Sequence, residues 1–129
     1  MLKLGRGNKI LMRKKPEGSL PYKEAWYIFG GELTADLTPE EAIKNQVKKQ
    51  TSIDINFVKS LGWDTETKKD LDGVEKLFVY LDCLCEYVSG ELHPSSDIEK
   101  LEWVEIENLK NYDLVLPSKA LFRKLGYLQ

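Results

Sequence analysis

The feature that most constrains the fold is a compact helix-start signal at residues 38–41. Thr38 is a good N-cap, Pro39 suits the first helical position, and Glu41 completes a capping box with Thr38. The apolar residues that follow at helical spacing are Ala42, Ile43 and Val47. The sequence therefore predicts an amphipathic helix over residues 39–51, which needs an apolar partner surface elsewhere in the chain.

Short apolar runs on both sides of this helix supply that partner. We expect strands over residues 9–12, 26–29, 53–63, 76–88 and 101–104, with turns or loops at 15–19, 64–73 and 89–91. Residues 64–73 are polar and charged and are expected to form a hairpin loop. Gly30 and Gly31 end the second strand, and we expect unusual backbone angles there. Strands interleaved with helices indicate an α/β layered domain.

Two further patterns complete the expected architecture. The run 76–88 is apolar on both faces, which predicts a central strand covered on both sides. Pro117 and Ser118 begin a last helix, whose inward-facing residues are Leu121, Phe122 and Leu125. Because no Gly/Ser/Pro-rich linker divides the chain, we expect one domain over residues 1–129.

Composition excludes several classes of protein. The chain has 129 residues, 42% of them hydrophobic, and a formal net charge of −2. This apolar content argues against disorder, and the near-balanced charge argues against a nucleic-acid binder. No apolar run approaches the roughly 20 residues that cross a bilayer, and residues 1–5 lack the apolar stretch of a secretory signal. We therefore expect a cytoplasmic protein with no membrane or nucleic-acid partner, and the sequence leaves its oligomeric state open.

Residues 26–53 resemble the signature region of the Nudix (MutT-like) hydrolase superfamily, written G-x5-E-x7-R-E-U-x-E-E-x-G-U with U aliphatic. The double glycine, the Thr-Pro-Glu helix start, Val47 and Ile53 fall in register without a gap. The resemblance implies a Nudix-like α/β/α sandwich with a mixed sheet, one central helix that carries the signature and a C-terminal helix. It also implies Mg²⁺-dependent hydrolysis of a nucleoside diphosphate linked to another group, with the signature glutamates holding the metal.

The signature is degenerate in this chain at its acidic positions. Those positions, with the neighbouring arginine position, are occupied by Leu37, Asn45, Gln46, Lys49 and Gln50, and Ser52 replaces the signature glycine. Amide oxygens bring no charge to offset the dehydration of Mg²⁺, and a lysine repels it. Acids come first in the helix and lysines later, an order that suits the helix dipole without a bound cation. The sequence therefore leaves open whether the protein is an enzyme.

Candidate site residues fall into two groups. The candidates for binding a nucleotide-like or other small anionic ligand are Gly30, Gly31, Gln46, Lys49, Trp26 and Tyr80; Lys44 and Lys48 extend the basic group around Lys49. The acids that could replace the lost metal ligands are Glu32, Asp36, Glu40 and Glu102. Cys83 and Cys85 with His93 make an incomplete zinc set, and we expect the two thiols to pack as small apolar groups.

Three functions follow from these patterns. The leading hypothesis is a protein that binds a nucleotide or another anionic ligand, with weak or no hydrolysis and no cofactor. The second is an active pyrophosphohydrolase with relocated acidic ligands, and only this one requires Mg²⁺. The third is a protein-interaction domain without a small ligand.

Overall fold

The computed structural model describes residues 1–3, 8–18 and 22–129. Its elements are β1 (Leu2–Lys3), β2 (Lys9–Lys14), β3 (Trp26–Tyr27), α1 (Pro39–Thr51), β4 (Asp54–Lys69), β5 (Glu75–Ser89), β6 (Lys100–Glu105), a 3-10 helix η1 (Ile106–Asn111) and α2 (Leu116–Lys124). The described strands join in one mixed sheet with the order β3-β2-β1-β5-β4, and β6 pairs with β2. The two pairings of β1 differ in direction, because β1 runs antiparallel to β2 and parallel to β5.

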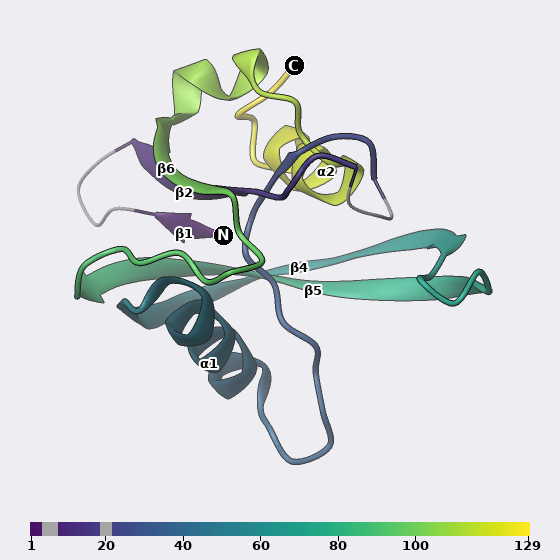
Figure 1. Ribbon diagram of the computed structural model, residues 1–129, viewed down its shortest axis with the longest axis horizontal. Coiled ribbons are helices and arrows are strands. Elements are labelled where there is room, and N and C mark those ends of the chain that lie inside the picture. The colour runs from purple at the N-terminus through teal and green to yellow at the C-terminus, as the bar shows by residue number, and fades with distance from the viewer. Residues whose placement is uncertain (4–7, 19–21) are drawn as a thin grey trace.

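The two long helices lie on opposite sides of the sheet (Figure 1). The cluster on the α1 side contains Leu11, Phe29, Ile43, Val47, Ile53, Ile55, Cys85 and Ile98. The cluster on the α2 side contains Met1, Ile10, Met12, Val104, Leu109, Leu114, Leu121 and Phe122. Strand β2 contributes Leu11 to one cluster and its neighbours Ile10 and Met12 to the other, as strand alternation requires. The expected α/β/α layering is confirmed.

Both expected helices form. Helix α1 occupies residues 39–51 as predicted, with the Thr38–Glu41 capping box in place. Helix α2 begins at Leu116, and it buries Leu121 and Phe122 fully while Leu125 stays half-buried. No helix among the described residues is long and apolar enough to span a membrane.

The β4–β5 hairpin differs most from the sequence expectation. Strand β4 continues to Lys69 and β5 begins at Glu75, so the expected loop over 64–73 shrinks to residues 70–74. The hydrogen bonds from Asp70 N to Val74 O and from Gly73 N to Asp70 O, both 2.9 Å long, close that loop. Residues 64–69 are polar yet extended because each lies opposite a residue of β5, a pairing that local composition does not reveal.

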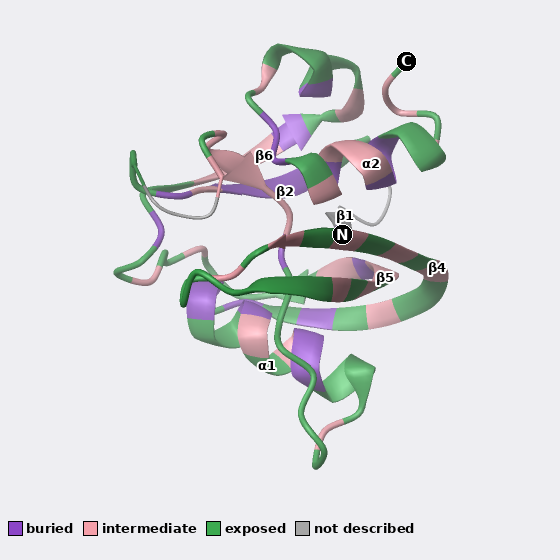
Figure 2. Cartoon of the chain, turned by 90° about the vertical axis from the view of Figure 1, so that its right-hand side faces the viewer, coloured by how far each residue is buried: buried purple, intermediate pink, exposed green. Residues whose placement is uncertain are grey.

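Strand β5 is also less covered than its apolar sequence predicts. Its inner half packs between the two helical layers, but Leu77, Val79 and Leu81 in its outer half are exposed. Figure 2 shows the same exposure along the outer parts of β4 and β5. The expectation that β5 is covered on both sides is therefore wrong for its outer half, which extends beyond the reach of α1.

Smaller differences concern the strand ends. The expected strand over 26–29 is assigned only at Trp26–Tyr27, and the expected turn at 15–19 lies partly outside the described residues. Gly30 and Gly31 do not adopt the expected unusual angles. Among the described residues other than glycine, only Ser52 has a positive φ, of 67°.

Candidate functional site

The glycine turn lies directly against helix α1. A Cβ atom on Gly31 would lie 3.1 Å from the Cβ of Gln46 and 3.2 Å from the backbone oxygen of Ala42, whereas one on Gly30 would meet nothing within 4 Å. The backbone at Gly31 therefore approaches the helix so closely that a side chain there would have to displace its neighbours by a few tenths of an ångström. This contact brings together two of the candidate ligand-binding residues, Gly31 and Gln46.

A buried arginine of strand β2 contacts the C-terminal half of helix α1. Gln50 is 5% exposed, and its Oε1 accepts a 2.5 Å hydrogen bond from Nη1 of Arg13, which is itself buried on β2. The Arg13 Nε donates to the Ile28 carbonyl at 3.2 Å. The guanidinium carbon lies 3.9 Å from the centre of the Tyr27 ring and 5.0 Å from that of Phe29. Burial lowers the pKa of Arg13, but a guanidinium remains protonated at physiological pH.

The carboxylate of Asp97, in the loop after β5, lies near the positive charge of Arg13. The Ser95 backbone N–H donates to the Gln50 carbonyl at 3.0 Å, which places this loop at the end of α1. The Ser95 hydroxyl hydrogen-bonds Asp97, and this bond, with the nearby charges of Arg13 and Lys49, lowers the pKa of Asp97. Cations from β2 and α1 therefore face one carboxylate on the loop after β5.

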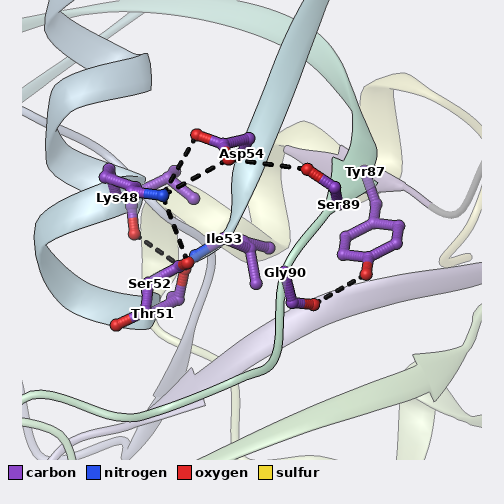
Figure 3. Close-up of polar contacts among 9 residues, drawn as sticks. Lys48, Thr51, Ser52, Ile53, Asp54, Tyr87, Ser89 and Gly90 are labelled. Carbon is purple, nitrogen blue, oxygen red and sulfur yellow. Dashed lines mark hydrogen bonds and ion pairs between the residues drawn. The ribbon is translucent and has the colours of Figure 1, made fainter.

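The C-terminal end of α1 is held by polar contacts to the next strands (Figure 3). The Lys48 Nζ lies 3.2 Å from Asp54 Oδ1 and 3.5 Å from the Ser52 carbonyl. Gly90 has a φ of 105°, and a Cβ there would lie 3.0 Å from the Ser52 backbone oxygen. The turn after β5 therefore packs against the end of the helix, and Ser52 stands at the signature glycine position in a left-handed conformation.

None of the remaining signature positions carries an acidic residue. Leu37 is half-buried in the loop before α1, while Asn45 and Lys49 are exposed on the helix. Lys44 pairs with Glu40 at 3.3 Å, on the first turns of the helix. The helix therefore presents amides and a lysine at the positions where the family resemblance implies glutamates.

In the part of the chain that the structure describes, the acids proposed as substitute metal ligands do not form one cluster. Glu32 and Asp36 are exposed in the loop before α1. Glu102 pairs in register with Met12 of the α2-side cluster, which places it on the face of the sheet opposite Arg13, and its carboxylate lies 3.9 Å from Lys100 Nζ. No group of three or more His, Cys, Asp or Glu residues suited to a metal occurs in the described part of the chain.

The two aromatic candidates also lie apart from Gln46 and Gln50. Trp26 packs edge-on against Tyr112 at 5.1 Å, in the α2-side cluster. Tyr80 lies on the outer hairpin, where its hydroxyl donates to Glu66 at 2.9 Å and accepts from Lys68 at 3.0 Å. Both rings already have partners of their own.

The residues around Gln46 and Gln50 do not fit a Mg²⁺ ion. Mg²⁺ prefers hard, charged oxygen ligands. This place offers two amides, the exposed Lys49, the buried Arg13 guanidinium and one carboxylate, Asp97, which both cations already face. The same set of donors and positive charges suits an anion. The charges at this place therefore favour a phosphate or a carboxylate over a divalent cation.

Sequence reasoning missed Arg13 and Asp97. Arg13 has a signal, because it follows Leu11 by two residues and so shares the face of β2 that packs on α1. Asp97 has no comparable signal, since it lies in a loop whose position depends on the packing of residues far away in the sequence.

Comparison with known proteins agrees with this fold. The chain is 24% identical to the nucleoside triphosphatase NudI of Klebsiella pneumoniae (strain 342) over 109 residues, 80% of this chain and 77% of that protein. It is 30% identical to the ADP-ribose pyrophosphatase of Methanocaldococcus jannaschii over 105 residues, 81% of this chain and 59% of that longer protein.

A solved structure and a family model extend the comparison. A Nudix hydrolase from Nitrosomonas europaea superposes with a TM-score of 0.76 at 14% identity, over 97% of this chain and 84% of that one. The family model of the NUDIX domain matches residues 2–125. Because that match spans nearly the whole sequence, this chain belongs to the Nudix family.

Proposed function

We propose that this Nudix-family chain binds a nucleotide-like or other small anionic ligand without a metal, and that it hydrolyses diphosphates weakly or not at all. The observation that supports this proposal is the hydrogen bond from the Arg13 guanidinium to Gln50, at a signature position where the family resemblance implies a metal-binding glutamate. A fixed positive charge of the protein itself thus lies beside this part of the helix.

The electrostatics favour an anion over a cation there. Two unit charges 4 Å apart interact by about 4 kcal/mol at an effective dielectric of about 20, so Arg13 and Lys49 each disfavour a nearby divalent ion. The same charges attract a phosphate, which lysine binds as a point charge and arginine as a planar fork. We infer that Lys49, which is exposed, contacts the ligand and that the buried Arg13 acts mainly through its field.

The family supports a phosphate-bearing nucleoside as the ligand class. Nudix proteins bind nucleotide-like substrates, and the two named relatives are a nucleoside triphosphatase and an ADP-ribose pyrophosphatase. ADP-ribose and ATP are therefore the first probes. The close approach of Gly31 to α1 places a backbone segment beside Gln46, where it could contact a phosphate.

The test is calorimetric titration of ADP-ribose and ATP, with Mg²⁺ and with EDTA, alongside an assay for product release. We expect binding that EDTA does not weaken, and turnover far below the roughly 1–10³ s⁻¹ typical of enzymes. Lys49→Met should weaken binding at least fivefold. Lys48→Met is the matched control, because Lys48 is also exposed near the end of α1 but pairs with Asp54. Equal losses in the two variants, or binding that disappears in EDTA, would contradict the proposal.

Family membership itself favours one alternative, an active pyrophosphohydrolase that uses relocated acids and Mg²⁺. The candidates remain Glu32, Asp36, Glu40 and Glu102, which would have to converge when ligand binds. If the wild-type protein hydrolyses either probe with Mg²⁺ and the double variant Glu32→Gln, Glu102→Gln does not, this alternative replaces ours.

A further inference from the structure

The outer part of the β4–β5 hairpin forms a two-stranded ribbon, defined here as residues 63–69 of β4 and 75–81 of β5. The register pairs Trp63 with Leu81, Thr65 with Val79, Thr67 with Leu77 and Lys69 with Glu75. Residues directly opposite each other in an antiparallel pair point to the same side. These four pairs therefore make up one face, which we name the apolar ribbon face.

The apolar ribbon face is open to solvent. Trp63 is 69% exposed, Leu77 66% and Val79 57%. The face carries no charge along these strands until Lys69 and Glu75 at its outer end. The register skips no residue of β5 between Leu81 and Cys85, so Leu81 shares its side with Cys83 and Cys85, which pack toward α1. The ribbon face is thus the uncovered continuation of the face that α1 covers further in.

The opposite face of the ribbon is packed against the rest of the chain. There the Glu66 carboxylate accepts hydrogen bonds from Tyr22 and Tyr80, and Lys68 contacts both rings. Lys124 of α2 donates to the Trp63 carbonyl at 3.2 Å. The ribbon is therefore held in place from one side only, and its other side presents an ordered, exposed apolar face of the kind that association surfaces use.

A second copy of this chain fits that face. When two ribbons pack face to face and antiparallel about a two-fold axis, Trp63 of each copy meets Lys69 of the other and Val79 meets Leu77. The same operation places Thr65 against Thr67 and Leu81 against Glu75. A lysine over an indole is a favourable contact, and opposing β-branched and aliphatic residues pack as in a β-sandwich. Lys69 and Glu75 carry opposite charges at the rim, so the face has no net charge to oppose its own copy.

The position of α1 selects the antiparallel arrangement. Face-to-face sheets lie about 10 Å apart, which is also about the diameter of a helix. In a parallel arrangement the inner ends of both copies would coincide, and each α1 would collide with the sheet of the other copy, because both would need the same layer. In the antiparallel arrangement the two α1 helices lie at opposite ends of the paired ribbons.

We propose that two copies of this chain associate through the apolar ribbon face to form a two-fold symmetric dimer. The dimer buries the outer half of β5 on both sides, as its sequence pattern predicts and the isolated chain does not achieve. This inference does not depend on the proposed ligand or on catalysis.

Analytical ultracentrifugation over about 1–300 μM, a range suited to small non-obligate interfaces, tests the proposal. We expect the wild-type mass to rise from one chain to two, and Val79→Glu to weaken association at least tenfold. Leu116→Glu on α2 is the matched control, because Leu116 is 54% exposed and lies outside the ribbon, and it should dimerise like the wild type. Circular dichroism confirms that each variant folds. A wild-type protein that stays monomeric, or a Val79→Glu variant that dimerises undiminished, overturns the proposal.

The pairing of Trp63 with Lys69 is tested separately. Lys69→Met keeps the length of the side chain and removes its charge, so we expect association to weaken about two- to fivefold. Lys59→Met changes an exposed lysine of the same strand outside the ribbon and should have no effect. Undiminished association of Lys69→Met overturns the antiparallel register.

Discussion

Two regions of this molecule depart from the usual separation of polar and apolar surface, in opposite directions. Near α1 a charged side chain is inside, since Arg13 is only 8% exposed. On the ribbon the large apolar side chains of Trp63 and Leu77 are outside. In the first region the exceptional group has its partners within the chain, namely Gln50 and the Ile28 carbonyl. In the second region the exceptional groups stay exposed.

The difference separates two kinds of functional evidence. A buried cation whose hydrogen bonds are all internal contributes to the fold, and it affects a ligand through its charge. An exposed apolar face does not stabilise the monomer, and its burial lowers the free energy only when another surface covers it. The α1 region therefore affects the stability of the fold and the sign of the charge that a ligand can carry, whereas the ribbon affects association between chains. Substitutions in each region test whether the two roles are truly distinct.

The largest effect is expected for Arg13→Met. Methionine fills a similar length but leaves the buried Gln50 amide oxygen and the half-buried Ile28 carbonyl without their donor. We expect the free energy of unfolding to fall by about 2–4 kcal/mol, because breaking one side of a buried polar contact costs the desolvation of what remains. Urea denaturation at a protein concentration near 1 μM measures it.

The paired control is Val79→Thr on the ribbon. At a concentration where the chain is monomeric, this change should alter the free energy of unfolding by less than about 0.5 kcal/mol, as surface substitutions usually do. Equal losses for Arg13→Met and Val79→Thr would remove the distinction between an internal and an associative region.

The second effect concerns the β4–β5 hairpin at the inner end of the ribbon, where Asp82 faces Asp64 and Lys124. Burial, reinforced by the hydrogen bond and charge of Asp64, raises the pKa of Asp82 to about 7, and Lys124 offsets this only in part. The Asp82 Oδ2 is buried, has no hydrogen-bond partner among the residues that the structure describes, and lies 3.6 Å from Lys124 Nζ. The folded protein therefore binds a proton that the unfolded chain has already lost between about pH 4 and pH 7.

The sign of the pH dependence follows directly. Because the pKa is higher in the folded state, this group makes the protein less stable as the pH rises from about 4 to 7, with the loss complete above 7. Asp82→Asn should flatten this slope in melting temperatures between pH 4.5 and 8, and it should raise the melting temperature at pH 8. Asp72→Asn is the control, since hydrogen bonding from Lys76 lowers the pKa of that exposed acid. A slope unchanged by Asp82→Asn would rule out Asp82 as its source.

The same comparison shows what the sequence could reveal. Helix α1 was predictable to its ends because its cap, proline and apolar stripe are all local signals. The ribbon was not, because residues 64–69 become a strand only through pairing with β5, which lies beyond the turn. At the site, the loss of acids was visible from the sequence, whereas the contact between Arg13 and Gln50 joins residues 37 positions apart. Signals within a few residues of each other thus predicted helix α1, whereas the buried positive charge at the site depends on packing between distant parts of the chain.

A smaller, stabilising effect is expected at the end of α1. Ser52 has a φ of 67°, a conformation that costs an ordinary L-residue roughly 1–2 kcal/mol and glycine much less. Its backbone N–H bonds the Lys48 carbonyl, a contact that glycine keeps. Ser52→Gly should therefore raise the free energy of unfolding by about 1 kcal/mol, measured by urea denaturation. A loss of stability would show that the Ser52 side chain has a role of its own.

The smallest effect compares the two adjacent glycines, and it tests how closely the glycine turn is fitted to the helix. Neither glycine has a positive φ, so alanine is compatible with both backbones. At Gly30 the new methyl group meets nothing, and the reduced entropy of the unfolded chain should leave stability unchanged or slightly increased.

At Gly31 the methyl group meets the Gln46 side chain and the Ala42 carbonyl, which belongs to the helix and cannot move alone. We expect Gly31→Ala to be less stable than Gly30→Ala by about 0.5–1 kcal/mol and to bind ADP-ribose more weakly. If the two variants match in both measurements, the close approach of Gly31 to α1 has no part in ligand binding, and the proposed site must lie elsewhere on the helix.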